Sequence, residues 1–146
     1  MIKYIFFDVS ATLLGKPILF TTIQNTLKDH NYNVSIENII QKHKLLSEVI
    51  HFPDRTDEDF YKKFNSDLLY LLGIVPTNSL LDAVFKSCTY LPWEKFEDTS
   101  VLTELGVPLG IISNFNTTLK DKLNSFFGNI FQDIFLNSLP QQQDRL

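Results

Sequence analysis

An aspartate stands where the first apolar run of the chain ends. Residues 2–7 are apolar or aromatic at almost every position, which predicts a strand covered on both faces of a parallel sheet. Asp8 follows this run directly, and a loop of small and hydroxylated residues comes after it. Ligands of open α/β sheets bind beyond the carboxyl ends of the strands, so a carboxylate here would lie in a binding crevice. The alternative is an aspartate that only begins a turn, and this segment alone does not separate the two.

Polar residues also follow a second apolar run, far downstream. Residues 107–112 are mostly apolar and lead into Ser113 and Asn114. Taken alone, these two side chains are most simply strand-end caps, and Thr12 in the first loop is most simply a turn hydroxyl. A chemical role for any of them therefore depends on the two segments being read together.

Read together, the two segments resemble motifs of the haloacid dehalogenase-like (HAD) superfamily. Residues 8–13 read DVSATL, where the family usually carries DxDGTL after an apolar strand. Residues 107–114 read VPLGIISN and are similar to the second motif, an apolar strand that ends in Ser or Thr and often continues with Asn. Residues 91–106 are similar to the helix that usually precedes that strand. The resemblance covers residues 1–136.

The resemblance implies covalent catalysis by the first aspartate. In the family this residue, here Asp8, attacks phosphorus, or carbon in the dehalogenases, and forms an aspartyl intermediate that divides one displacement into two easier steps. Thr12 would hold substrate oxygens or orient Asp8. Ser113 would donate a hydrogen bond to the transferring group. Ser10 and Asn114 are the implied substrate-binding residues.

Two positions depart from the first motif. Ser10 replaces the second aspartate, which protonates the leaving group and later activates water, work worth typically ~10² to 10⁴-fold in rate. A serine hydroxyl does not titrate near neutral pH, so we do not expect efficient phosphomonoester hydrolysis, whereas a slow or atypical hydrolase stays open. Ala11 replaces the glycine. The backbone N–H groups of residues 9–13 could still cradle an anion.

The family's later motifs have no clear counterparts. Lys120 and Lys122 are the only lysines after Ser113, on a predicted amphipathic helix where we expect both side chains to point into water. Asp144 lies in a polar, glutamine-rich segment that predicts no strand. Mg²⁺ is the cofactor that the phosphate-transferring branches imply. Asp8 with one backbone carbonyl would bind it weakly, because Mg²⁺ demands near-octahedral oxygen ligation.

The sequence between the two motif strands predicts helices almost throughout residues 17–90. Ser35 is a plausible N-cap, Thr56 opens a second helix with acidic residues in its first turn, and residues 79–88 form a shorter one. Their aromatic stripes are typical of a packed core, and their histidines have no ligand-like spacing. Four helices at this place are similar to the helical cap that the family inserts after its first strand.

We therefore expect an α/β fold, an incomplete Rossmann-like parallel sheet core with an inserted α-helical cap. The core comprises residues 1–15 and 92–146, and the cap residues 16–91. The strand candidates are few, which leaves the first strand as an exposed apolar edge. We expect a C-terminally shortened member of the family that self-associates through this strand. The strand candidates are residues 2–7, 107–113 and 132–136.

Composition and charge narrow the classes of partner. The 146 residues are 44% hydrophobic and include 13 phenylalanines, which predicts a folded globule. A net charge of −4 with no basic cluster gives no reason to expect nucleic acid or an anionic membrane, and no apolar run reaches the ~20 residues of a membrane span. The lone Cys88 and the absence of a visible signal peptide favour a cytoplasmic protein.

Three functional hypotheses follow. The first is a HAD-like hydrolase that acts on a small phosphorylated, less readily a halogenated, metabolite through an aspartyl intermediate, with activity impaired by Ser10 and the missing motifs. The second is a non-catalytic chain that binds a partner, so whether the chain is an enzyme stays open. The third is an unrelated helical interaction module, which would require that residues 2–7 and 107–113 form no parallel pair.

Overall fold

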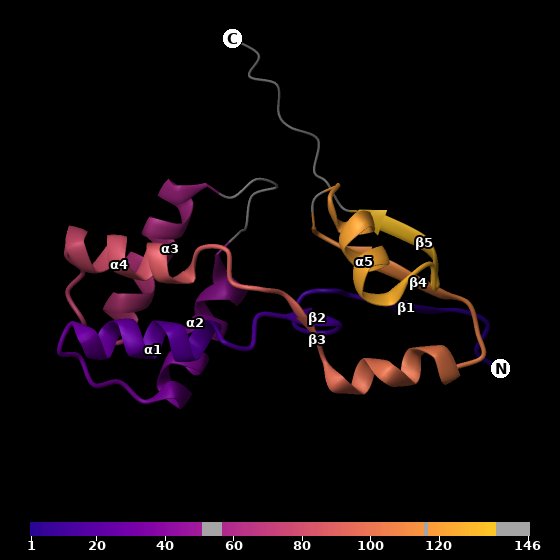
Figure 1. Ribbon diagram of the computed structural model, residues 1–146, viewed down its shortest axis with the longest axis horizontal. Helices are drawn as coiled ribbons and strands as arrows, with labels where there is room; N and C mark the ends of the chain where they lie inside the picture. Colours follow the sequence, from indigo (N-terminus) through magenta and orange to yellow (C-terminus); the bar gives the residue numbers. More distant parts are fainter. Residues whose placement is uncertain (51–56, 116, 137–146) are drawn as a thin grey trace, which may run out of the picture. The chain divides into compact units, whose positions relative to one another are not determined.

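The computed structural model describes residues 1–50, 57–115 and 117–136, and the chain divides into two units (Figure 1). One unit, here called the core unit, comprises Met1–Gly15 and Trp93–Leu146. The other, here called the helical unit, comprises Lys16–Pro92. Each has its own cluster of buried apolar side chains. The chain thus forms a discontinuous α/β unit with an all-helical unit inserted near its start.

The core unit contains a three-stranded parallel sheet in the order β1-β4-β5. Strand β1 (Ile5–Phe7) pairs with β4 (Leu109–Ser113), and β4 pairs with β5 (Phe131–Leu136). In the first pair Ile5 lies opposite Leu109 and Phe7 opposite Ile111. This register confirms the α/β fold with a parallel core sheet and excludes the unrelated helical module.

One face of this sheet is covered by the helices that flank β4. These are η1 (Glu97–Glu104), a 3-10 helix, and α5 (Leu119–Phe127). Leu102 of η1 and Leu119 and Leu123 of α5 join the buried side chains of the sheet and of the loop after β1 in one cluster. The sequence predicted a helix before β4 at this place, and the structure makes it 3-10 instead of α.

Large apolar side chains of the sheet are also exposed. Phe6 is 44% exposed, Ile112 53% and Phe135 55%. Phe6 and Phe135 contact each other, with ring centroids 5.9 Å apart. The prediction that the first strand is covered on both faces is therefore wrong for the described residues. We call Phe6, Ile112 and Phe135 the exposed sheet patch.

Gly110 of β4 lets the rings of Tyr4, just before β1, and Phe6, in β1, lie across its backbone. A Cβ atom on Gly110 would come within 2.6 Å of the Phe6 ring and 2.8 Å of the Tyr4 ring. Beyond Gly110, the Tyr4 hydroxyl donates a 2.6 Å hydrogen bond to Asp133 of β5, and this bond raises the pKa of Tyr4. Tyr4 and Phe6 thus connect the start of the sheet's first strand to β5 across the backbone of β4.

A two-stranded ribbon lies where the chain leaves and re-enters the core unit. Strand β2 (Leu14–Gly15) pairs antiparallel with β3 (Glu94–Lys95). The Phe96 ring lies so close to Gly15 that a Cβ there would meet it at 2.8 Å. The ribbon therefore ties together the two chain segments that connect to the helical unit.

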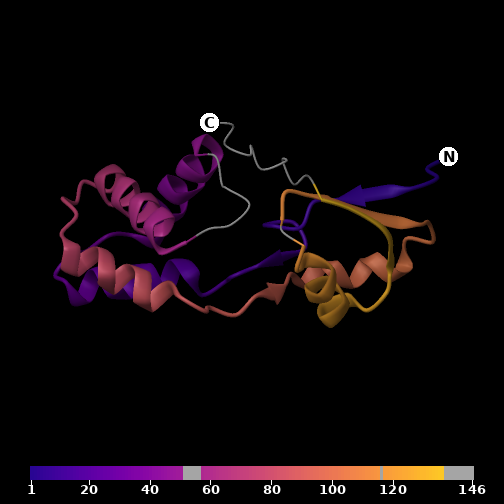
Figure 2. The same ribbon diagram turned by 90° about the horizontal axis from the view of Figure 1, so that it is seen from above.

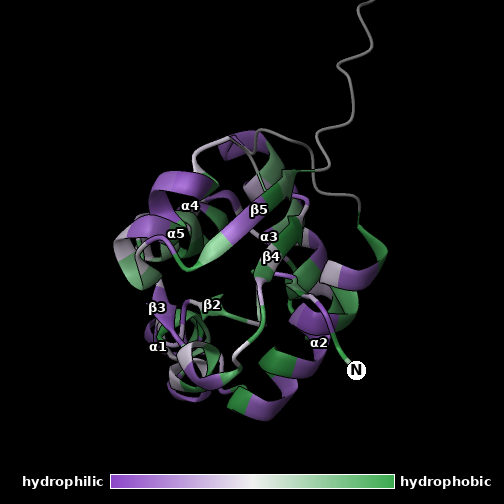
Figure 3. Ribbon diagram, turned by 90° about the vertical axis from the view of Figure 1, so that its right-hand side faces the viewer, coloured by the Kyte–Doolittle hydropathy of each residue, from purple (hydrophilic) through white to green (hydrophobic). Residues whose placement is uncertain are grey.

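The helical unit consists of four amphipathic helices in its described residues (Figure 2, Figure 3). Ser35, Asp57 and Thr77 cap three of them, each side chain accepting the N–H three residues later. Thr56 lies outside the described residues, and the helix that it was predicted to open begins after Asp57. No helix in the described part of the chain is long and apolar enough to cross a membrane. The helices are α1 (Leu19–Asp29), α2 (Ile36–Val49), α3 (Glu58–Leu71) and α4 (Asn78–Cys88).

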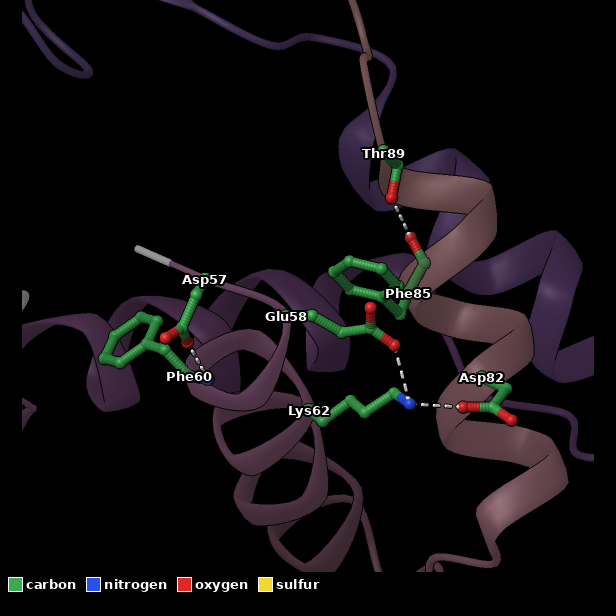
Figure 4. A network of polar contacts seen from close by, with 7 residues as sticks. All are labelled: Asp57, Glu58, Phe60, Lys62, Asp82, Phe85 and Thr89. Atoms are coloured by element: carbon green, nitrogen blue, oxygen red, sulfur yellow. Dashed lines mark hydrogen bonds and ion pairs between the residues drawn. The ribbon is translucent and has the colours of Figure 1, made fainter. Parts of the chain in front are cut away.

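An ion-pair network joins α3 to α4 on the surface of the helical unit (Figure 4). The Lys62 ammonium lies 2.8 Å from Glu58 on its own helix and 2.7 Å from Asp82 on α4. The hydrogen bond to Asp82, followed by the hydrogen bond to Glu58, raises the pKa of Lys62. The hydrogen bond from Lys62 in turn lowers the pKa of Asp82. Such exposed ion pairs contribute little to stability.

Candidate active site

The loop after β1 is a tight turn closed on one carbonyl. The Val9 carbonyl accepts the N–H groups of Thr12 at 3.2 Å, Leu13 at 2.9 Å and Leu14 at 3.0 Å. Val9, Leu13 and Leu14 are buried in the core unit, whereas Thr12 is exposed. Buried apolar side chains therefore anchor the turn, and its polar positions face outward. Asp8, at its start, is also exposed at the carboxyl end of β1.

Ala11 has a left-handed backbone, with φ of +59°. This conformation costs an L-residue roughly 1–2 kcal/mol, whereas glycine adopts it freely. Its N–H donates to the Leu14 carbonyl at 2.9 Å, so the left-handed residue helps to close the turn. Ala11 thus has a backbone conformation that favours glycine, the residue that the resembled motif carries at this position.

The predicted anion cradle over residues 9–13 is wrong in its second half. The N–H groups of Ala11, Thr12 and Leu13 all donate to carbonyls within the loop. They cannot also point at a bound anion. An anion at this loop would have to rely on the residues before Ala11 and on side chains.

Ser113 and Asn114 lie at the same edge of the sheet as Asp8. Strands β1 and β4 are parallel neighbours, so their carboxyl ends meet at one edge. If the register is continued by one residue, Asp8 lies beside Ile112. With strands ~4.8 Å apart and a rise of ~3.3 Å per residue, the Cα atoms of Asp8 and Ser113 are then roughly 6 Å apart. The structure thus brings together two residues that are distant in the sequence.

The Ser113 hydroxyl is positioned to donate a hydrogen bond. Ser113 is only 5% exposed, and its Oγ accepts the N–H of Phe115 at 3.2 Å. Accepting this bond leaves the hydroxyl proton available for another group. Asn114, directly after it, is exposed at the end of the strand. Ser10 is exposed too, and it pairs with Leu14 through an isolated bridge.

A shallow depression of about 510 Å³ lies next to Thr12 in the core unit. It is lined by Ala11, Thr12, Phe96, Glu97 and Asp98. The two carboxylates on its wall would repel an anion. This depression therefore does not suit a phosphate group.

Lys122 departs from the prediction that both lysines of the last helix point into water. Its Nζ lies 5.3 Å from the centre of the Trp93 ring and 5.9 Å from that of the Phe115 ring. Lys120, two residues earlier, is exposed. The helical spacing could have predicted this position, because Lys122 lies three residues after Leu119 and next to Leu123, which are both buried. A lysine stem at such a position can lie along the buried face of the helix.

The described residues do not form a complete metal site. They contain no group of three or more His, Cys, Asp or Glu side chains that could hold an ion. His30 contacts the Thr26 carbonyl through Nδ1, and His43 packs between the rings of Phe20 and Phe64. His51 lies outside the described residues. Asp8 would supply one oxygen ligand to Mg²⁺, which is too few for the geometry that this ion requires.

Comparison with known proteins relates the chain to solved structures only. No family model and no curated protein matches it. A predicted phosphoglycolate phosphatase from Haemophilus somnus is 19% identical, with a TM-score of 0.52 over 95% of this chain and 64% of that chain. A protein assigned as a HAD-hydrolase from Bacillus subtilis, bound to magnesium, is 17% identical, with a TM-score of 0.53 over 92% of this chain and 64% of that one.

A conserved haloacid dehalogenase-like protein of unknown function from Agrobacterium tumefaciens is 19% identical, with a TM-score of 0.54, and the match covers 93% of this chain and 59% of that chain. These likenesses confirm that the chain has the HAD-like fold. It spans less than two thirds of the length of these three proteins.

Proposed function

We propose that the chain slowly hydrolyses a phosphate ester of a small metabolite, with Asp8 as the nucleophile. The observation that carries the proposal is the parallel register of β1 and β4, which sets Asp8 and Ser113 at one edge of the sheet. The HAD-like fold supports it, since the similar structures include a predicted phosphatase. Turnover by the chain and by a variant without the Asp8 carboxylate tests it.

The proposed reaction has two displacements. A carboxylate oxygen of Asp8 attacks phosphorus, the bond from phosphorus to the ester oxygen breaks, and an aspartyl phosphate forms. The departing oxygen takes its proton from solvent water, because Ser10 cannot act as an acid near neutral pH. Water then attacks phosphorus, releases phosphate and restores the Asp8 carboxylate. The absence of an acid at position 10 is the reason to expect slow turnover.

The other side chains of the site would bind and orient. Ser113 would donate its free hydroxyl proton to a phosphoryl oxygen, and Asn114 would donate from its amide. Thr12 would orient the Asp8 carboxylate, and this role suits it better than direct contact with phosphate, given the acidic depression beside it. Ser10 would contribute a hydroxyl to the ester oxygen.

Mg²⁺ would supply charge neutralisation to such a reaction, as a cation beside the transferring group does. Asp8 is the ligand that this chain would offer. The described residues form no set of three metal ligands, so neither of the two proposed displacements is assigned to Mg²⁺.

The alternative is a binding function without turnover. The exposed sheet patch of Phe6, Ile112 and Phe135 favours a binding function, because neighbouring exposed apolar side chains often mark interaction surfaces. Loss of the acid at position 10 also fits a chain that has given up hydrolysis.

The test is turnover of a panel of phosphate esters, with and without Mg²⁺, by the chain and by its Asp8→Asn variant. We expect slow release of phosphate that falls by about 10²-fold or more in the variant, because the nucleophile is lost. Ser10→Asp should raise the rate, by up to about 10²-fold, if the rest of the site is competent. Equal release by the chain and Asp8→Asn would refute the proposed nucleophile and leave the binding function.

A further inference from the structure

Strand β1 lies at an edge of the core sheet. In the described residues the strand order is β1-β4-β5, so β1 has a neighbouring strand on one side only. The Ile5 N–H donates to the Pro108 carbonyl at 3.1 Å, so the backbone groups of Ile5 are directed toward β4. Successive residues of a strand direct these groups to opposite sides. The N–H and carbonyl groups of Phe6 are therefore directed away from β4, toward a side where no described strand pairs with them.

The aromatic rings of this segment leave the free edge of β1 uncovered. The rings of Tyr4 and Phe6 stack with centroids 4.6 Å apart, and a Cβ on Gly110 would meet both of them. Both rings therefore lie over β4, on the side opposite to the free edge. The outward backbone groups of Phe6 are not shielded by these two rings.

The strand also lacks the features that usually protect a sheet edge from pairing. Protected edges typically carry a proline, a bulge or charged side chains. Residues 4–7 are Tyr, Ile, Phe and Phe, and β1 pairs with β4 in an unbroken register. Charged residues stand only at the two ends of this run, Lys3 before it and Asp8 after it. The free edge is thus suited to pairing with another extended segment.

A second copy of the same strand is complementary to this edge. If two β1 strands lie antiparallel with Phe6 opposite Phe6, a two-fold axis relates the copies, and each Phe6 N–H can donate to the Phe6 carbonyl of the other copy. Lys3 at the start of one strand is then close to Asp8 at the end of the other, and this happens twice. A parallel arrangement would place like charges side by side. Charge complementarity therefore favours the antiparallel arrangement.

We propose that the chain forms a symmetric dimer in which the β1 strands of two copies pair antiparallel around Phe6. Two three-stranded sheets then join into one continuous sheet, and the free edge of β1 is occupied in both copies. The two-fold axis is perpendicular to the sheet, so helices η1 and α5 of both copies cover the same face. The two exposed sheet patches come together on the other face. The dimer is independent of the proposed hydrolysis, because backbone groups of β1 hold it together.

The test is the dissociation constant of the dimer, measured by sedimentation velocity over a range of concentrations of the full chain. Phe6→Pro removes the outward N–H but retains the groups of Ile5 and Phe7 that face β4, as proline on an edge strand can. Phe6→Ala is the matched control, because it also loses the ring but keeps the N–H. We expect the dissociation constant of Phe6→Pro to be at least about tenfold above that of Phe6→Ala, since the central hydrogen bonds are lost.

Hydrogen exchange of single amides, followed by NMR, gives a second measurement on the unmodified chain. The Phe6 amide should exchange at least about tenfold faster at low than at high protein concentration, whereas the Ile5 amide, bonded to Pro108, should be protected at both. The inference would be overturned by a monomer at all concentrations, by equal dissociation constants of the two variants, or by Phe6 exchange that does not depend on concentration. If Phe6→Pro fails to fold by circular dichroism, the exchange measurement alone decides.

Discussion

Replacement of Ala11 by glycine should stabilise the core unit. Ala11 has a φ of +59°, in the region that glycine adopts without a steric penalty. Relief of the left-handed penalty, roughly 1–2 kcal/mol, is offset in part by the greater freedom of glycine in the unfolded chain, about 0.5–1 kcal/mol. The net change in the free energy of unfolding should be about +1 kcal/mol. That corresponds to about a fivefold shift in the folding equilibrium.

The assay is urea unfolding at low protein concentration, followed by Trp93 fluorescence. Trp93 belongs to the same unit as Ala11, so its signal reports the part of the chain that changes. With a slope of about 2 kcal/mol per molar urea, the midpoint should rise by about 0.5 M in Ala11→Gly. Circular dichroism of both proteins at zero urea checks that the native secondary structure is the same.

Ala11→Val is the matched control in the opposite direction. A β-branched side chain is a genuine outlier at positive φ, so this variant should lower the midpoint. The reasoning would be refuted if Ala11→Gly left the midpoint unchanged or lowered it. It would also be refuted if the glycine and valine variants shifted the midpoint in the same direction.

Three further predictions concern the sheet and the helical unit. Gly110→Ala should destabilise the core unit by about 1–3 kcal/mol, because the new Cβ would meet the Phe6 ring at 2.6 Å; an unchanged urea midpoint would show that the ring moves away freely. The chain should self-associate through its exposed sheet patch, and Phe6→Lys should shift it toward monomer in sedimentation velocity; identical sedimentation of both proteins at all concentrations would contradict this. Burial between the rings of Phe20 and Phe64 lowers the pKa of His43 below its ordinary 6.5, so the unfolded chain takes up a proton first as the pH falls. The stability of the helical unit should therefore be complete above about pH 6.5 and decline below it, and His43→Leu should remove this part of the decline; an equal decline in the variant would assign it to other groups.

Interactions between neighbouring residues set where most helices of the helical unit begin, so the sequence alone could predict these helices. A helix start depends on a side chain that accepts an N–H three residues later, so Ser35 could be identified from its neighbours alone. The second start was placed one residue early, at Thr56 instead of Asp57, because both are good capping residues. The apolar stripes also predicted correctly that these helices pack against one another.

The two apolar runs, each followed by polar residues, were likewise enough to identify the two motifs and to predict the parallel α/β core. What the sequence does not contain is the pairing register. Only the tertiary structure places Asp8 and Ser113 at the carboxyl ends of neighbouring strands, because the two strands are joined through the whole helical unit. Their roles stay predictions until the variants are measured.

Packing decided the remaining features. Local spacing assigned Lys122 to a solvated helix face, but its surroundings are set by Trp93, which lies in a different segment of the chain. In the same way, an apolar run such as residues 2–7 predicts a strand but not how many neighbours cover it, and Phe6 is exposed where the run predicted burial. Composition and periodicity thus determined the elements and their polar ends, whereas contacts between distant segments determined which side chains meet.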